Sequence, residues 1–321
     1  MNTFDVLGEN PLKKMIISRF RWYQYGVLNL NAIPLSTKPV VLALAPDTTT
    51  NVNAMGTIIN LIGLNLTDRG IATFSRNNIY KSFYKDVVDL EYNVGKIFEA
   101  TPEVYNIEFF SGKLGEYNKA VVSHQGFLIN KIKDLTLKYE TELGIPTKTL
   151  FADYYTDYNT ASQNKITKSN KVTKNSADYK NILDLFLDQM WINMLVTAGA
   201  YVKEKGVAKT FFHPQVLHAY HYTSSGVLIA KPLLVTIDPE SIALCDIAVK
   251  TTEKLIVQNP GKKSFFLFSS ADLLELNNIP DDALEIEPGD EVMLEGSTLK
   301  KYIYVANKET TGKAKAELSL M

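Results

Sequence analysis

The chain has 321 residues, of which 45% are hydrophobic and 21% are charged, and its formal net charge at pH 7 is −1. These values are typical of a folded protein and argue against a nucleic-acid binder, whose affinity depends on excess Lys and Arg. The single cysteine, Cys245, excludes an intrachain disulfide. No apolar run approaches the roughly 20 residues of a membrane-spanning helix, so we expect no transmembrane segment.

Residues 1–50 form an aromatic-rich N-terminal segment. Its start, MNTFDVLGENPLKK, lacks the basic residues and apolar run of a signal peptide, so we expect synthesis in the cytoplasm without one. Later export or release as part of an assembly is compatible with this start. A short helix is predicted from Pro11, because proline suits the first helical position. The run VVLALA at 40–45 favours a short strand or an extended segment.

Three aromatic residues in this segment have two interpretations. They pack against the first helices of their own chain, or they anchor the segment in a neighbouring subunit, because aromatic residues are enriched at interface cores. These residues are Trp22, Tyr23 and Tyr25.

Residues 51–205 are predicted to form an antiparallel bundle of about four long helices. Apolar residues recur at spacings of three and four over 79–97 and 114–143. Gly144 with Pro146 is a helix stop signal, after which another helix is expected. Residues 179–200 are the most apolar helical stretch, and we expect them to form the central helix, with Trp191 buried.

Residues 163–175 are polar and Lys-rich, and they are interpreted as either a loop or an exposed helical bridge. Residues 271–299 contain acids and no Lys or Arg. The two stretches are either solvated surfaces or complementary patches through which copies dock in one register. The basic residues are Lys165, Lys168, Lys171 and Lys174, and the acids are Asp272, Glu275, Asp281, Asp282, Glu285, Glu287, Asp290, Glu291 and Glu295.

Residues 206–225 are predicted to be a linker, and they hold three of the four histidines. Imidazole is a common metal ligand, so His213, His218 and His221 are weak candidates for a metal site. The alternative is ordinary packing or exposed histidines, because the stretch has no HExxH pattern and no cysteine lies nearby. We expect no cofactor.

Residues 226–321 change to short apolar runs separated by Gly, Pro, Asn and Asp, which predicts a β-sandwich. The runs KLIVQNPG and SFFLFS, the turn EPGDE before VML, and KYIYVAN before AKAELSL resemble an immunoglobulin-like or fibronectin-III-like module over residues 232–320. The order of a bundle followed by a sandwich is similar to structural and surface proteins of bacteria and phages. The predicted fold class is therefore α+β and multidomain.

The sequence favours three functions. The first is a non-enzymatic structural or assembly protein, a subunit of a homo-oligomeric, virion-type or appendage-type assembly whose partners are copies of itself or other subunits. The second is a carbohydrate- or protein-binding module that uses the sandwich. The third is a metal-assisted enzyme at the interdomain histidines. The first is preferred because the chain has no G-x-S-x-G, GxGxxG or Walker pattern.

Overall fold

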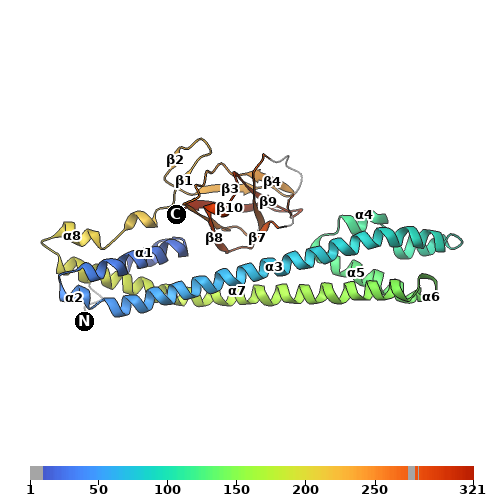
Figure 1. The fold of residues 1–321 in the computed structure, drawn as a ribbon, viewed down its shortest axis with the longest axis horizontal. Coiled ribbons are helices and arrows are strands. Elements are labelled where there is room, and N and C mark those ends of the chain that lie inside the picture. Colours follow the sequence, from blue (N-terminus) through green and yellow to red (C-terminus); the bar gives the residue numbers. More distant parts are fainter. Residues whose placement is uncertain (1–9, 274–278, 281) are drawn as a thin grey trace. The chain divides into compact units, whose positions relative to one another are not determined.

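The computed structural model describes residues 10–273, 279–280 and 282–321 (Figure 1). The described chain is α+β, with long helices in its N-terminal part and antiparallel sheets in its C-terminal part. It divides into two compact units, one made of Met1–Leu64 with Thr173–Met321 and the other of Asn65–Val172. The domain boundaries predicted at residues 50, 205 and 225 were drawn from composition and hydrophobic period. Whether the segments between them fold independently stays a prediction.

The helices are α1 (Arg19–Ala32), α2 (Pro39–Leu42), α3 (Ala45–Ile97), α4 (Lys113–Asn118), α5 (Val122–Lys138), α6 (Glu140–Leu143), α7 (Ile145–Ala200) and α8 (Lys205–Thr210). A π-helical segment covers Val104–Phe109, and 3₁₀ turns cover Pro11–Lys14, Ile33–Leu35, Pro214–Leu217 and Gly296–Thr298. The strands are β1 (His221–Tyr222), β2 (Leu228–Ile229), β3 (Leu233–Ile237), β4 (Ser241–Leu244), β5 (Lys254–Gln258), β6 (Phe265–Ser270), β7 (Leu284–Ile286), β8 (Glu291–Glu295), β9 (Tyr302–Asn307) and β10 (Ala314–Leu320).

A seven-residue repeat of inward-facing side chains runs through α3 and α7, which have 53 and 56 residues. Spacings of three and four keep one stripe of a helix turned toward a partner helix. The stripe of α3 is buried throughout, and that of α7 is buried or half-buried. On α3 it consists of Val52, Met55, Ile59, Ile62, Leu66, Arg69, Thr73, Arg76, Tyr80, Phe83, Val87, Leu90 and Val94. On α7 it consists of Phe151, Tyr154, Tyr158, Ala161, Lys165, Lys168, Val172, Asn175, Tyr179, Ile182, Phe186, Gln189 and Asn193.

In the first unit, α1 packs on the ends of α3 and α7 that belong to this unit. The Trp22 ring is 1% exposed and lies edge-on to Phe186, with 6.5 Å between the ring centroids. Met55 and Met190 belong to the same buried cluster. Gly26 allows this close approach, because a Cβ at this position would lie 2.5 Å from Cε2 of Phe186.

A buried polar junction ties the same three helices together. Nδ2 of Asn193 on α7 donates to Oδ1 of Asn29 on α1 at 2.7 Å and to Oγ1 of Thr48 on α3 at 2.9 Å. Nε2 of Gln189 donates to Oδ1 of Asn193, and Nδ2 of Asn29 donates to the carbonyl oxygen of Phe211. Each amide therefore finds partners inside the core, which offsets the cost of removing it from water.

The second unit has an aromatic core. The Phe83 ring is 0% exposed and lies edge-on to Phe151 at a centroid distance of 5.9 Å. The hydroxyl of Tyr80 donates to the carbonyl oxygen of Tyr117 at 2.8 Å. The hydroxyl of Tyr117 donates in turn to the carbonyl oxygen of Phe109 at 2.7 Å. The rings supply apolar area while both buried hydroxyls stay hydrogen-bonded.

The strands of the first unit form two four-stranded sheets, ordered β3-β10-β5-β8 and β4-β9-β6-β7, together with the β1-β2 hairpin. All of the pairs are antiparallel. In the first sheet, Leu318, Val257 and Val292 are neighbours on one face and are buried. The opposite face carries Glu317, Gln258 and Glu291 in the next row. Side chains alternate between faces along a strand, so one face is apolar and the other is partly polar.

Several helical predictions were wrong in detail. The run at 40–45 is not a strand, because Pro39 starts α2 and the chain then enters α3 at Ala45. The single helix predicted over 114–143 is divided into α4, α5 and α6. Trp191 is only half-buried, because the stripe of α7 turns the polar side chain of Asn193 inward instead.

We predict that Asn193→Ala lowers the free energy of unfolding by roughly 2–4 kcal/mol, because Asn29, Thr48 and Gln189 each lose a buried hydrogen-bond partner. Urea denaturation monitored by circular dichroism measures the change. The control is Asn170→Ala, an exposed position on the same helix, where we expect a change within about 0.5 kcal/mol. Equal losses in the two variants would contradict the junction.

We also predict that Gly26→Ala lowers the free energy of unfolding by about 1–3 kcal/mol, because the new methyl group overlaps the buried Phe186 ring. The matched control is Gly63→Ala on α3, where a Cβ meets no atom within 4 Å. That variant should gain up to about 1 kcal/mol from helix propensity. A gain in both variants would show that α1 does not approach α7 this closely.

Candidate functional site

A row of polar side chains crosses three neighbouring strands of the first sheet. Glu317 on β10 pairs with Gln258 on β5, which pairs with Glu291 on β8. Nε2 of Gln258 donates to Oε2 of Glu291 at 2.8 Å. Two carboxyl groups on one sheet face with an amide between them are a candidate for acid–base chemistry, provided that a substrate can reach them.

The start of α1 covers one end of this row. The Ser18 hydroxyl donates to Oε1 of Glu291, and the backbone amide of Arg19 donates to Oε2 at 3.3 Å. The Arg19 guanidinium also donates to the backbone carbonyl of Glu291. The Glu291 residue is 9% exposed, and both of its carboxylate oxygens accept hydrogen bonds from the protein. This carboxylate therefore has a structural role in holding α1 on the sheet.

Ser18 and Arg19 form a clamp on the sheet together with Arg21, which lies two residues after Arg19 on α1. Nη1 donates to the carbonyl oxygens of Val216 at 3.1 Å and His218 at 2.8 Å, and Nη2 donates to the Ser319 hydroxyl at 3.3 Å and to the Leu320 carbonyl. Burial lowers the pKa of Arg21 below its usual value. Since a buried guanidinium is stabilised only by well-placed acceptors, these carbonyls explain its position.

Glu317 is the remaining carboxyl group of the row, and it is half-buried. Its pKa is raised, first by desolvation and second by the negative charge of Glu291. The described structure gives no cation at hydrogen-bond distance from it. The row is therefore strained electrostatically at neutral pH, because a desolvated carboxylate and a second carboxylate share one face.

The three histidines predicted as candidate metal ligands differ in exposure and in their contacts. His221 is 4% exposed, and its Nδ1 donates to the carbonyl oxygen of Lys231 at 2.7 Å. His213 is half-buried and has Nδ1 3.4 Å from Nε2 of Gln215, while His218 is exposed. Across residues 10–273, 279–280 and 282–321, no group of three His, Cys, Asp or Glu side chains is placed to hold a metal ion.

The predicted aromatic anchor lies largely within its own chain. Trp22 and Tyr25 are 1% and 3% exposed, and Tyr23 is half-buried against Gly56 of α3. In this conformation Trp22 and Tyr25 have almost no surface to offer a neighbouring subunit. Their position agrees with core packing, the first of the two interpretations.

The Lys-rich stretch 163–175 is helical and lies within α7. Lys168 forms an ion pair of 2.6 Å with Asp68, Lys165 is half-buried, and Lys171 and Lys174 are exposed. The structure thus decides between the loop and the helix that the sequence left open.

The acidic stretch is not one solvated surface, which corrects the simpler of its two interpretations. Asp290 and Glu291 are buried, and Oδ2 of Asp290 accepts a hydrogen bond from the backbone amide of Glu287 at 2.8 Å. Glu295 pairs with Lys254 at 3.0 Å. Asp272 and Asp282 are exposed, whereas Glu275 and Asp281 lie outside the described residues.

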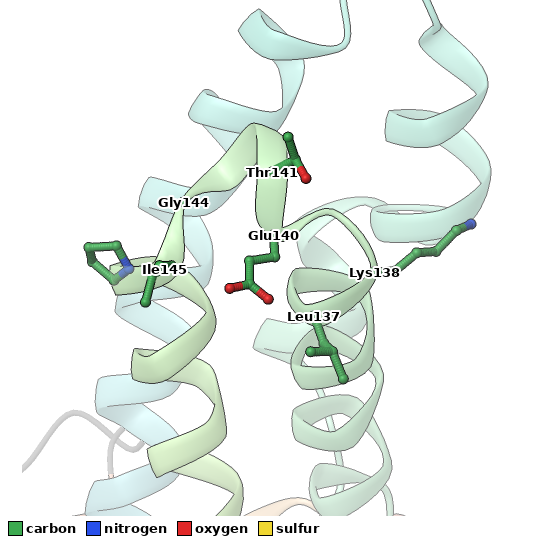
Figure 2. A pocket seen from close by; sticks show the side chains of 7 residues that line it. Leu137, Lys138, Glu140, Thr141, Gly144 and Ile145 are labelled. Atoms are coloured by element: carbon green, nitrogen blue, oxygen red, sulfur yellow. The ribbon is translucent and has the colours of Figure 1, made fainter.

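An open depression lies where α5, α6 and α7 meet in the second unit (Figure 2). Its charged side chains are already paired, since Glu140 binds Lys148 at 2.9 Å and Lys138 binds Glu108 at 2.6 Å. Figure 2 shows Lys138 pointing away from Glu140. The lining offers no convergent polar groups for a ligand, and it consists of Leu137, Lys138, Glu140, Thr141, Gly144, Ile145 and Pro146.

Cys245 follows β4 and is 4% exposed. Burial raises the pKa of its thiol to about 12. Because the thiolate is the reactive form, this cysteine is a small core residue rather than a nucleophile.

In comparisons with known proteins, no family model, no curated protein and no solved structure matches this chain. Within the described part of the chain, no helix is both long enough and apolar enough to cross a membrane.

We predict that Glu317→Gln stabilises the protein at neutral pH. The folded-state pKa of Glu317 lies above its ordinary value of 4.5, so ionisation costs more in the folded chain than in the unfolded chain. The gain should be full above the raised pKa and should vanish as the pH falls below 4.5, where both states are protonated. Thermal unfolding of both proteins between acidic and neutral pH measures it. The control, Glu295→Gln, removes an exposed paired carboxylate and should give no gain at neutral pH.

Proposed function

We propose that this chain is a non-enzymatic structural subunit that assembles with further copies of itself. The supporting observation is the composition of the outward side of α3. In the second unit, Ile71 and Tyr92 occupy equivalent positions of the seven-residue repeat, opposite the inward stripe, and are 63% and 70% exposed. Phe74 lies about one turn from Ile71 and is also exposed. A surface helix normally carries polar residues there, and grouped apolar side chains mark interaction surfaces.

The partner that fits this surface is an apolar helix face of a neighbouring copy. Such packing would remove the exposed side chains from water at about 25 cal/mol per Å² of apolar area. Helices from neighbouring copies would then pack beside α3, while the bundle of about four helices that the sequence predicts within residues 51–205 belongs to each single chain. An assembly of this kind, of the virion or appendage type, is compatible with export or release after synthesis.

The C-terminal sheets would be the second structural element of each subunit. We propose that they pack face to face as an immunoglobulin-like sandwich. The row Leu318, Val257 and Val292 supports this, as do Leu267 and Val305, which pair across β6 and β9 and are buried. Interleaved apolar faces of two antiparallel sheets are the core of such modules.

We predict that the full chain has a solution mass that is a multiple of 36.0 kDa, and that Ile71→Gln with Phe74→Gln lowers this mass without unfolding the chain. The reason is the loss of apolar area from an exposed helix face. Light scattering at several micromolar concentrations measures the mass, and circular dichroism checks the fold.

The matched control is Leu234→Gln on β3, a leucine that is 69% exposed and lies outside the helices. It should leave the mass unchanged. A native chain that is monomeric at every concentration would contradict the assembly proposal.

A further inference from the structure

The first unit carries an exposed apolar surface of its own, on the segments around α2 and α8. Figure 1 shows both short helices at the end of α3 and α7 that belongs to this unit. A small buried core here includes Val41 and Tyr201. The neighbours of these two residues in the chain are exposed and point away from that core. We call the exposed set the α2–α8 surface, and it consists of Leu35, Val40, Leu42, Val202 and Val207.

Polar contacts fix the two segments of this surface against each other. The Tyr201 hydroxyl lies 2.8 Å from the Ser36 hydroxyl and accepts a hydrogen bond from the backbone amide of Thr37 at 3.1 Å. Nζ of Lys38 pairs with Glu204 at 3.2 Å and lies 5.2 Å from the centre of the Tyr201 ring. The apolar side chains of both segments are therefore presented together.

The aliphatic side chains of this surface are far more exposed than packing within the chain would leave them. Leu35 is 82% exposed and Val202 is 63% exposed. Single exposed leucines and valines are ordinary, but a group of them on connected segments marks an interaction site. The surface therefore needs a partner that accepts aliphatic side chains.

Cations accompany these aliphatic side chains. Lys203, Lys205 and Lys209 are exposed, and no carboxylate of the described residues pairs with them. Lys205 and Lys209 are four residues apart on α8, so they share one side of it.

The local charge is positive, although the whole chain has a net charge of −1. Residues 31–50 and 198–210 contain the cations Lys38, Lys203, Lys205 and Lys209 and the acids Asp47 and Glu204, a difference of +2. Glu204 is paired with Lys38. Asp47 lies in the first turn of α3, where the positive end of the helix dipole stabilises it. The three lysines are thus left to attract an external anion.

We propose that the α2–α8 surface docks on a membrane surface that contains anionic lipids. Its aliphatic side chains would enter the boundary between headgroups and acyl chains, while the lysine stems lie along it and their ammonium groups reach the anionic headgroups. A protein partner fits less well, because protein interfaces are depleted of lysine and enriched in aromatic residues. The only aromatic residue within 31–50 and 198–210 is Tyr201, which is buried. This surface shares no residue with the assembly proposed above.

The test is cosedimentation of the full chain with lipid vesicles. One set contains phosphatidylcholine alone, and the other contains equimolar phosphatidylcholine and phosphatidylserine. We expect the partition coefficient to be about tenfold or more higher for the anionic vesicles. It should fall toward the neutral value in about 1 M salt, where the Debye length is about 3 Å. Equal binding to both sets would overturn the proposal, and so would binding to neither, which would favour a protein partner.

A pair of double variants assigns the electrostatic part to α8. Lys205→Gln with Lys209→Gln should lower the partition coefficient on anionic vesicles about 25-fold, at about fivefold for each lysine. The matched control is Lys85→Gln with Lys96→Gln, which removes two exposed lysines from α3 and changes the net charge equally. It should retain binding within about twofold, because the attraction falls off within a Debye length of the membrane. Equal losses in both variants would overturn the assignment to this surface.

A second pair tests the apolar part. Leu35→Gln with Val202→Gln should lower the partition coefficient about tenfold or more, because less apolar area leaves water on binding. The control, Leu234→Gln with Leu244→Gln, changes two exposed leucines of the strands and should keep full binding. Circular dichroism checks that each variant is folded, as expected for exposed positions. Full binding by the Leu35 and Val202 variant would overturn the proposed insertion.

Discussion

The seven-residue repeat of inward side chains is the constraint on which the rest of this structure depends. Helices of 53 and 56 residues gain little from propensity alone, because most helical stability in proteins comes from packing of one face. The repeat keeps that face in register along each helix while its chemistry changes. On α3 it is apolar as far as Leu66, cationic and polar from Arg69 to Arg76, aromatic at Tyr80 and Phe83, and aliphatic from Val87 to Val94. Each change in the chemistry of the stripe requires a different kind of contact from the elements packed against it.

In the first unit, the buried polar side chains require hydrogen-bond partners. The Asn193 junction joins α1, α3 and α7 through short polar side chains, and the clamp of Ser18, Arg19 and Arg21 joins α1 to the sheet. α1 is thus the element that connects helices to strands. Since its sheet partners Glu291 and Leu320 lie more than 270 residues later in the sequence, this contact closes a very long loop and is expected to form late in folding.

Much of the secondary structure was predictable, because hydrophobic period is a local property. The long helices, the change from helices to strands after α8, and the burial of Cys245 all follow from the pattern of apolar residues. The α+β class was therefore confirmed. The choice between a loop and a helix at 163–175 was not predictable, because three of the four stripe positions there are the polar residues Lys165, Lys168 and Asn175, which a hydrophobic pattern does not register.

The polar interior was missed for the same reason. Asn193, Arg21 and Arg76 are inside because of helix phase and distant partners, and their residue types argue for the surface. Extending the seven-residue spacing of Phe83, Val87 and Leu90 backward along α3 would have placed Arg76 and Arg69 in the stripe. The row Glu317, Gln258 and Glu291 has no comparable signal, because strand register joins residues far apart in sequence.

The shielded thiol of Cys245 has a practical consequence. Its burial and raised pKa leave the native chain without a surface thiol, since the sequence contains no other cysteine. A cysteine introduced at an exposed position such as Lys85 or Leu234 would then be the one site that reacts with a maleimide dye under native conditions. Fluorophores or spin labels could be attached in pairs without first removing a native residue. Distances between α3 and the C-terminal strands could then be measured in solution by energy transfer.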